Sequence, residues 1–129
     1  MTSRSILLFA ASAYIIVPAI SAVEPPQIQP FSFPRSHQTG KDVTVTCFAT
    51  EGTLPLRFAW LKDGEEIASG SKFAMKNPLE KMSTLIIHGV SAADIGNYTC
   101  RVLNDGGSDS FTASLLVTAA PVWLSEPKD

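Results

Sequence analysis

The amino-acid sequence predicts an all-β fold, a sandwich of two antiparallel sheets joined by one disulfide. Cys47 and Cys100 are the only cysteines of the chain. Trp60 follows the first cysteine by thirteen residues, and Tyr98 precedes the second by two. A two-sheet sandwich uses these residue types at its centre: the cysteines bridge the sheets, the indole packs on the bridge, and the tyrosine hydroxyl closes a corner. No segment shows sustained helical periodicity, which also favours an all-β chain.

Residues 1–22 have the layout of a secretory signal peptide. Arg4 provides a positive charge, residues 6–17 form an apolar stretch, and small residues follow. This stretch is too short to span a bilayer, although an uncleaved membrane anchor is the alternative. Cleavage after Ser21 or after Ala22 would suit signal peptidase. We therefore expect a secreted or extracellular protein, at the plasma membrane if it is part of a longer receptor.

The rest of the chain is enough for one small domain. A core of that size is marginal, so a covalent link is expected, and an oxidising compartment allows one between the two cysteines. The loop that it closes should contribute about 4 kcal/mol by chain entropy. No thiol then remains for catalysis or metal binding. Without Arg4, nine Lys and Arg stand against twelve Asp and Glu with no basic cluster, which disfavours nucleic-acid binding.

Alternation and turn residues predict the strands. Residues 26–34 contain three prolines, which confine this segment to the edge of a sheet. Residues 42–50 alternate with a period of two, and Cys47 marks the inward face. Asp63-Gly64 predicts a tight turn, and the loop over residues 104–107 is rich in residues that tolerate positive φ. Further strands are expected over residues 56–62, around Phe73 and Met75, over 83–88 with Leu85 and Ile87 inward, over 95–104, and over 111–117.

Asp94 has a predicted structural use. In this kind of sandwich an acidic residue four before the corner tyrosine commonly pairs with a basic residue, and Lys72 stands at the matching position. The alternative is a solvated loop carboxylate, worth less than about 1 kcal/mol. We place Asp94 with Trp60, Tyr98 and Leu85 among the structural core residues.

The residues needed for catalysis or for a cofactor are not found in the sequence. His37 and His88 have no second ligand at metal spacing, so both are predicted to be surface histidines. The segment from Asn104 to Asp109 loosely resembles a calcium loop, but it lacks the alternating ligands and the closing Glu. We expect no enzyme activity, no metal, no cofactor and no small-molecule substrate.

Asn97-Tyr98-Thr99 is an N-glycosylation sequon. Because Tyr98 and Cys100 point inward, Asn97 should point outward and could carry a sugar. The alternative is that the sequon is left empty.

Strand parity also nominates the outward residues. On the sheet of residues 42–50 and 83–88, the outward apolar residues are Phe48 and Ile86. On the other sheet they are Leu61, Leu103 and Leu116, with Arg57 and Arg101 among them. Scattered surface aliphatic residues are ordinary, whereas an adjacent group would suggest a protein-binding face.

Four sequence segments resemble an immunoglobulin-like I-set domain of the Dscam type (Down syndrome cell adhesion molecule). They are P-P-Q-I-Q-P-F-S-F-P from Pro25, W-L-K-D-G-E-E-I from Trp60, S-T-L-I-I from Ser83 and D-I-G-N-Y-T-C from Asp94. The opening and the tail A-P-V-W-L-S-E-P-K-D are similar to the variable seventh immunoglobulin domain of arthropod Dscam and the start of the domain after it. A signal peptide directly before such a domain resembles the shortened Dscams of chelicerates.

This resemblance implies a domain over residues 23–118, then a linker and the truncated start of a following domain over 119–129. It implies an adhesion or self-recognition module that binds another protein, namely a second copy of the same domain. The face that pairs in this family maps onto Thr44, Thr46, Phe48, Thr84, Ile86 and His88. An occupied Asn97 would shield part of the opposite sheet and favour that assignment, which parity alone does not.

Two other functions stay open. One is a soluble immune or salivary effector that binds a pathogen or host ligand, with Asp129 as its true terminus. The other is a structural spacer in an extracellular array. The interpretation as a fragment of a longer adhesion receptor rests on Trp123, which would otherwise be an exposed aromatic residue on a short stub.

Overall fold

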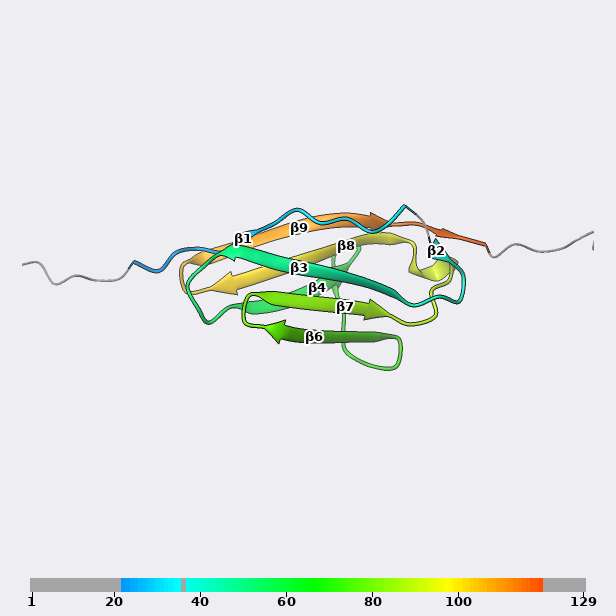
Figure 1. The fold of residues 1–129 in the computed structure, drawn as a ribbon, viewed down its shortest axis with the longest axis horizontal. Coiled ribbons are helices and arrows are strands. Elements are labelled where there is room, and N and C mark those ends of the chain that lie inside the picture. Colours follow the sequence, from blue (N-terminus) through cyan, green and yellow to red (C-terminus); the bar gives the residue numbers. More distant parts are fainter. Residues whose placement is uncertain (1–21, 36, 120–129) are drawn as a thin grey trace, which may run out of the picture.

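The computed structural model describes residues 22–35 and 37–119 and shows a β-sandwich. One sheet has the strand order β1-β3-β7-β6 and the other β5-β4-β8-β9. The described chain begins at one end of the long axis and finishes at the other (Figure 1). The strands are β1 (Gln27–Ile28), β2 (His37–Gln38), β3 (Val43–Glu51), β4 (Arg57–Lys62), β5 (Glu65–Glu66), β6 (Phe73–Leu79), β7 (Met82–Ile87), β8 (Gly96–Asn104), β9 (Gly107–Leu115) and β10 (Val117–Thr118).

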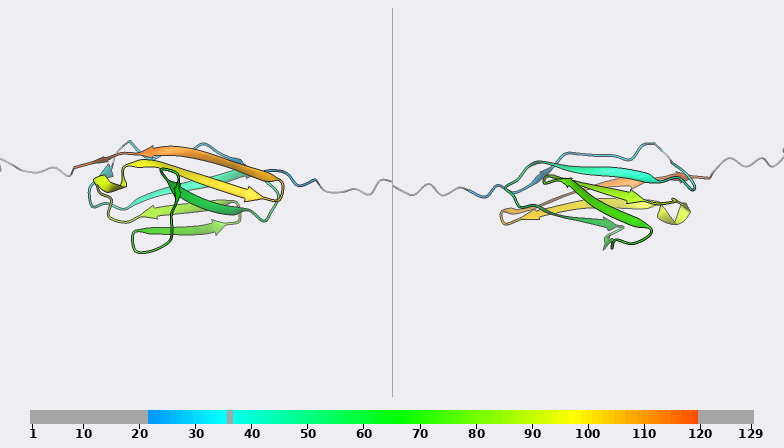
Figure 2. Two further views of the ribbon diagram at one scale, coloured as in Figure 1. Left: turned by 180° about the vertical axis from the view of Figure 1, so that it is seen from behind. Right: turned by 60° about the horizontal axis from the view of Figure 1, so that its bottom comes forward.

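The expected all-β sandwich with two antiparallel sheets is confirmed. In the part of the chain that the structure describes, the helical content is a single 3-10 turn, η1 (Ala92–Asp94). Within the two four-stranded sheets every neighbouring pair is antiparallel. Seen from behind and from below, the sheets lie as two layers with their strands running along the long axis (Figure 2).

The proline-rich opening differs from the single edge strand expected over residues 26–34. Gln27 and Ile28 pair with β3, and the Gln29 N–H still donates to the Phe48 backbone oxygen at 2.9 Å. The pairing with β3 ends at Pro30, because proline lacks the N–H group that a continuous ladder needs. Further along, the chain enters a separate two-stranded sheet, in which β2 pairs in parallel with β10.

Two phenylalanines of that opening pack into the core instead. The ring of Phe31 lies edge-on to Trp60 and Phe111, with centroids 5.8 and 5.1 Å away. Phe33 is buried and lies edge-on to Tyr98 at 5.5 Å. Aromatic pairs prefer this geometry, so the prolines hold an extended segment whose phenylalanines fill the space between the sheets.

The last expected strand is divided in two. The turn after β8 is only Asp105 and Gly106, so β9 begins earlier than expected, at Gly107. The chain breaks its pairing at Leu116 and resumes it in β10. Asn104 is buried at the turn, where Nδ2 donates to the backbone oxygens of Glu24 and Thr53 at 2.7 and 2.9 Å. This amide ties the start of the domain to two loops.

Candidate protein-binding face

The centre of the sandwich is a closed scaffold. Cys47 and Cys100 form the disulfide between the sheets, with their Cα atoms 6.4 Å apart. Trp60 is buried beside it, and its Nε1 donates to Ser83 Oγ at 2.9 Å. The Tyr98 hydroxyl donates to the backbone oxygen of Asp94 at 2.6 Å, and burial raises the pKa of that hydroxyl. The polar groups of Trp60 and Tyr98 are thus hydrogen-bonded within the core, so they are not available to bind a partner.

Asp94 lies at the corner where the two sheets are connected. Its side chain is 6% exposed, and Oδ2 lies 2.7 Å from Lys72 Nζ. The same oxygen accepts the backbone N–H of Ser91 at 2.8 Å, while the Ser91 hydroxyl accepts from Ala93. This is a capping box on η1. The carboxylate is therefore a buried structural anchor rather than a solvated loop residue.

The outward side of β3, β7 and β6 is termed the β3 face. The strand register arranges its residues in three rows. The first row is Thr44, Ile86 and Ala74, the second is Thr46, Thr84 and Lys76, and the third is Phe48, Met82 and Leu79.

Apolar groups therefore occupy both ends of the β3 face, and the middle row is polar. Phe48 is 36% exposed and Leu79 59% exposed, whereas Met82 and Ile86 are half-buried. In the middle row the hydroxyls of Thr46 and Thr84 lie 3.1 Å apart. Cross-strand pairs of this kind stabilise the pairing of the two strands. Ala74, Met82 and Leu79 belong to this face but do not appear in the sequence-based set.

His88, the last of the expected contact residues, lies directly after β7 and is exposed. Its Nδ1 is 3.3 Å from Asp42 Oδ2, and Asp42 Oδ1 accepts the Gly89 N–H at 2.9 Å. The Gly89 N–H and the His88 side chain lower the pKa of Asp42. His88 thus lies at the border of the β3 face, and its side chain contacts Asp42 of the same domain.

The outward side of β4, β8 and β9 is termed the β8 face, and one expectation there is wrong. Leu61 was assigned to the surface by parity, but it is 9% exposed. It stands between Thr99 of β8 and Glu66 of β5, whose side chains flank it on both strands. Leu103 is half-buried, and Leu116 is 56% exposed at the break between β9 and β10.

Polar pairs dominate the remainder of the β8 face. The hydroxyls of Thr99 and Thr112 lie 2.7 Å apart, and Ser114 Oγ donates to Asn97 Oδ1 at 2.7 Å. Arg101 lies between Ala59 and Ser110. The leucines that parity placed together are therefore not a continuous exposed patch.

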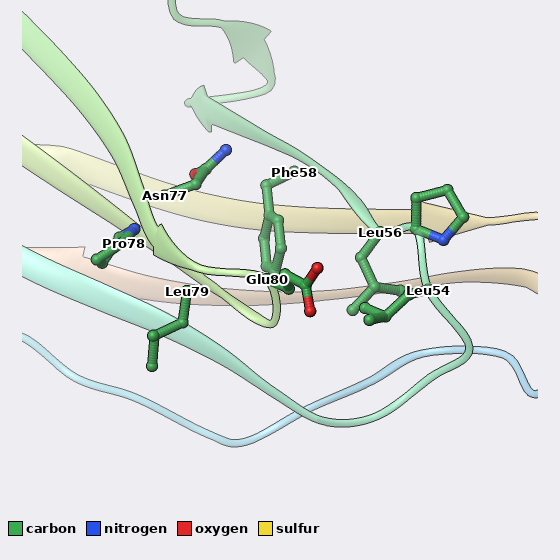
Figure 3. A pocket seen from close by; sticks show the side chains of 8 residues that line it. Leu54, Leu56, Phe58, Asn77, Pro78, Leu79 and Glu80 are labelled. Carbon is green, nitrogen blue, oxygen red and sulfur yellow. The ribbon is translucent and has the colours of Figure 1, made fainter.

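A cleft of about 540 Å³ opens at the side of the sandwich between the end of β6 and the segment before β4. Figure 3 shows the ring of Phe58 between residues 77–79 and the side chains of Leu54 and Leu56. Leu79 lines this cleft and also pairs with Met82 in the third row of the β3 face. The apolar end of the β3 face thus continues around the edge strand. The sequence pattern contains no signal for this continuity, because it depends on the turn between β6 and β7.

Neither histidine lies in a group of three or more possible metal ligands within residues 22–35 and 37–119. His37 was expected at the surface but is half-buried in β2, and its Nε2 is buried without a hydrogen-bond partner among the described residues. The described residues contain no group of three or more His, Cys, Asp or Glu that could hold a metal ion. In the same residues, no helix is long and apolar enough to cross a membrane. Residues 1–21 of the expected signal peptide and residues 120–129, which include Trp123, lie outside the described residues. Ala22 is the one residue of the expected signal peptide that the structure describes.

Comparisons with known proteins agree on the kind of domain. The immunoglobulin I-set domain family matches residues 26–117. The mouse cell adhesion molecule DSCAML1 is 37% identical over 105 residues, 81% of this chain and 5% of that protein. The Drosophila melanogaster cell adhesion molecule Dscam2 is 34% identical over 113 residues, 85% of this chain and 5% of that protein. The chain thus spans only about one twentieth of these relatives.

Solved structures give the same result. The Dscam1 Ig7 domain, isoform 5, superposes with a TM-score of 0.70 at 30% identity, covering 76% of this chain and 100% of that one. An I-band fragment of titin has a TM-score of 0.70 at 33% identity, covering 76% of this chain and 34% of that one. By sequence, by the disulfide-centred sandwich and by these likenesses, this chain belongs to the immunoglobulin I-set domain family and is similar to the domains of Dscam cell adhesion molecules.

Proposed function

We propose that this chain is an extracellular adhesion and recognition module, and that its β3 face binds a second copy of the same domain. The observation that carries the proposal is the arrangement of the β3 face, with apolar rows at both ends of a polar middle row. An isologous contact brings the same patch of two copies together about a two-fold axis. In such a contact the Phe48 row of one copy can lie over the Ile86 row of the other, and the threonine rows meet at the centre.

Two further points support the proposal. Relatives that are 34–37% identical to this chain over the aligned 105–113 residues, about 5% of their own length, are named cell adhesion molecules. On the β8 face Leu61 is buried, and the strongly exposed Leu116 lies apart from it at the break between β9 and β10, so that face offers no row of exposed apolar residues like that of Phe48. Burial of apolar surface is the main favourable term in association.

The test compares one substitution on each face. Ile86→Asp places a carboxylate within the β3 face, where burial in a contact without a partner would be costly. Leu103→Asp is the matched change on the β8 face, because both residues are half-buried leucine-sized side chains on central strands. Analytical ultracentrifugation over a concentration series should show self-association of the unsubstituted domain, at least tenfold weakening by Ile86→Asp and little change by Leu103→Asp. Circular dichroism would establish that both variants are folded.

Other outcomes contradict the proposal in distinct ways. Weakening by Leu103→Asp alone would move the contact to the β8 face. A dimer that neither change weakens would remove both faces. A domain that stays monomeric at the highest concentration would show that it does not pair by itself.

A structural spacer is the second candidate, because the chain is also similar to about a third of an I-band fragment of titin, in which such a domain is one part of a longer chain. A spacer needs no self-association, so the same sedimentation series separates the two functions.

A further inference from the structure

We propose that Asn97 carries an N-linked glycan, so that the sugar lies on the β8 face. Asn97-Tyr98-Thr99 is the only Asn-x-Ser/Thr sequence in the chain, since Asn77 is followed by proline and Asn104 by Asp105-Gly106. An N-linked glycan on these 129 residues therefore has a single possible position. This inference does not depend on self-association.

The geometry of Asn97 suits an attached sugar. The residue is exposed near the start of β8, while its neighbour Tyr98 is fully buried. The Ser114 hydroxyl contacts Oδ1 of Asn97, which leaves Nδ2, the atom that is glycosylated, outside that hydrogen bond. A sugar on Nδ2 would extend into solvent above β8 and β9 without displacing a core residue.

The same contacts indicate when the sugar is attached. In the folded domain the Asn97 N–H donates to Asp63 Oδ1 at 2.9 Å, and its backbone oxygen accepts the Asp63 N–H at 2.8 Å. The Thr99 hydroxyl lies 2.7 Å from that of Thr112. These contacts hold the sequon extended between two strands, so the proposal implies that the sugar is transferred before β8 pairs with its neighbours.

In the transfer reaction, a lipid-linked diphospho-oligosaccharide is the donor of the sugar. A bond forms between Asn97 Nδ2 and the anomeric carbon of the sugar. The bond from that carbon to the lipid diphosphate breaks, and Nδ2 releases one proton. The Asn97 side chain points away from the β3 face, because the two outward faces lie on opposite sides of the sandwich. The glycan would therefore cover part of the β8 face and leave the β3 face open.

The experiment expresses the full chain in eukaryotic secretory cells and treats both cell extract and medium with an N-glycosidase. The expected result is one downward shift on a gel for the unsubstituted chain. Asn97→Gln and Thr99→Ala should each abolish the shift, and Thr99→Ser should keep it. Thr112→Ala is the matched control, because it removes the same hydroxyl pair as Thr99→Ala and leaves the sequon intact.

Three results would overturn the proposal. The first is an unsubstituted chain that enters the medium and shows no shift. The second is a shift that persists in Asn97→Gln. The third is loss of the shift in Thr112→Ala, which would tie the modification to this strand contact rather than to the sequon. Because extracts are included, a variant that is retained in the cell still gives a result.

Discussion

The two outward faces of the sandwich contain similar numbers of apolar side chains but differ in how far these side chains are exposed. On the β3 face, Phe48 and Leu79 are 36% and 59% exposed at the same end of three strands. On the β8 face, Leu61 is 9% exposed, and polar pairs join the neighbouring strands β8 and β9. The comparison teaches that parity identifies the side of a sheet on which a residue lies, whereas cross-strand neighbours determine whether a partner can reach it.

The largest effect should come from the buried leucine of the β8 face. Leu61→Ala should lower the free energy of unfolding by about 2–4 kcal/mol, because it removes a buried side chain and leaves a cavity. Phe48→Ala on the β3 face should cost about 1 kcal/mol, since part of the ring is already in water. Urea denaturation followed by circular dichroism measures both. Equal losses would show that the two faces do not differ in this way.

Asp94 provides a test of the corner at which the two sheets are connected. Asp94→Ala removes the ion pair with Lys72 and the hydrogen bond from Ser91. Lys72 is 38% exposed and stays hydrated, so we expect a loss of about 1–2 kcal/mol rather than the larger penalty of a fully buried pair. Asp105→Ala, an exposed acidic residue, is the control, with a change within about 0.5 kcal/mol. A comparable loss in both variants would mean that the corner contacts contribute nothing specific.

The two threonine pairs allow a matched test of the faces. Thr46→Val on the β3 face and Thr112→Val on the β8 face each remove one hydroxyl contact and keep the branched shape. Each should cost about 0.5–1 kcal/mol of stability. Only Thr46→Val should alter the sedimentation of the domain, because Thr46 lies in the proposed contact. An altered sedimentation of Thr112→Val alone would reverse the assignment.

The smallest effect concerns acid stability. Asp42, just before β3, and Asp63, just after β4, accept backbone N–H groups from Gly89 and Asn97 respectively, and these bonds lower the pKa of each carboxyl below its ordinary 3.8. A depressed folded-state pKa gives stability that is present above the unfolded value and is lost as pH falls through the folded value. Asp42→Asn and Asp63→Asn should each flatten the pH dependence of stability below pH 3.8, measured by thermal melts. An unchanged profile would show that these bonds do not persist in solution.

Much of the scaffold was predictable from particular residues. The spacing of the two cysteines, Trp60 and Tyr98 predicted the sandwich and its inside, and the structure confirms the fold. Other features were not predictable. The proline-rich opening was expected as one strand, because its sequence does not show that two phenylalanines would be needed between the sheets. The burial of Leu61 depends on residues far along the chain that flank it after folding.

The residues of the β3 face also divide into those that the sequence predicts and those that it does not. Thr44, Thr46, Phe48, Thr84 and Ile86 could be nominated, because they alternate with core residues on long central strands. Leu79 and Met82 could not, since the register shifts between Lys76 and Leu79 before the turn.

The sequence by itself determined which side chains point inward, because a strand places successive residues on opposite faces and one disulfide marks the inner face. Only the tertiary structure decided which outward side chains stay accessible, how the apolar row of Phe48 continues into the cleft beside β6, and that Asp94 is buried. The physical reason is that alternation is a local property of the backbone. Exposure is instead set by contacts between strands that are distant in the sequence.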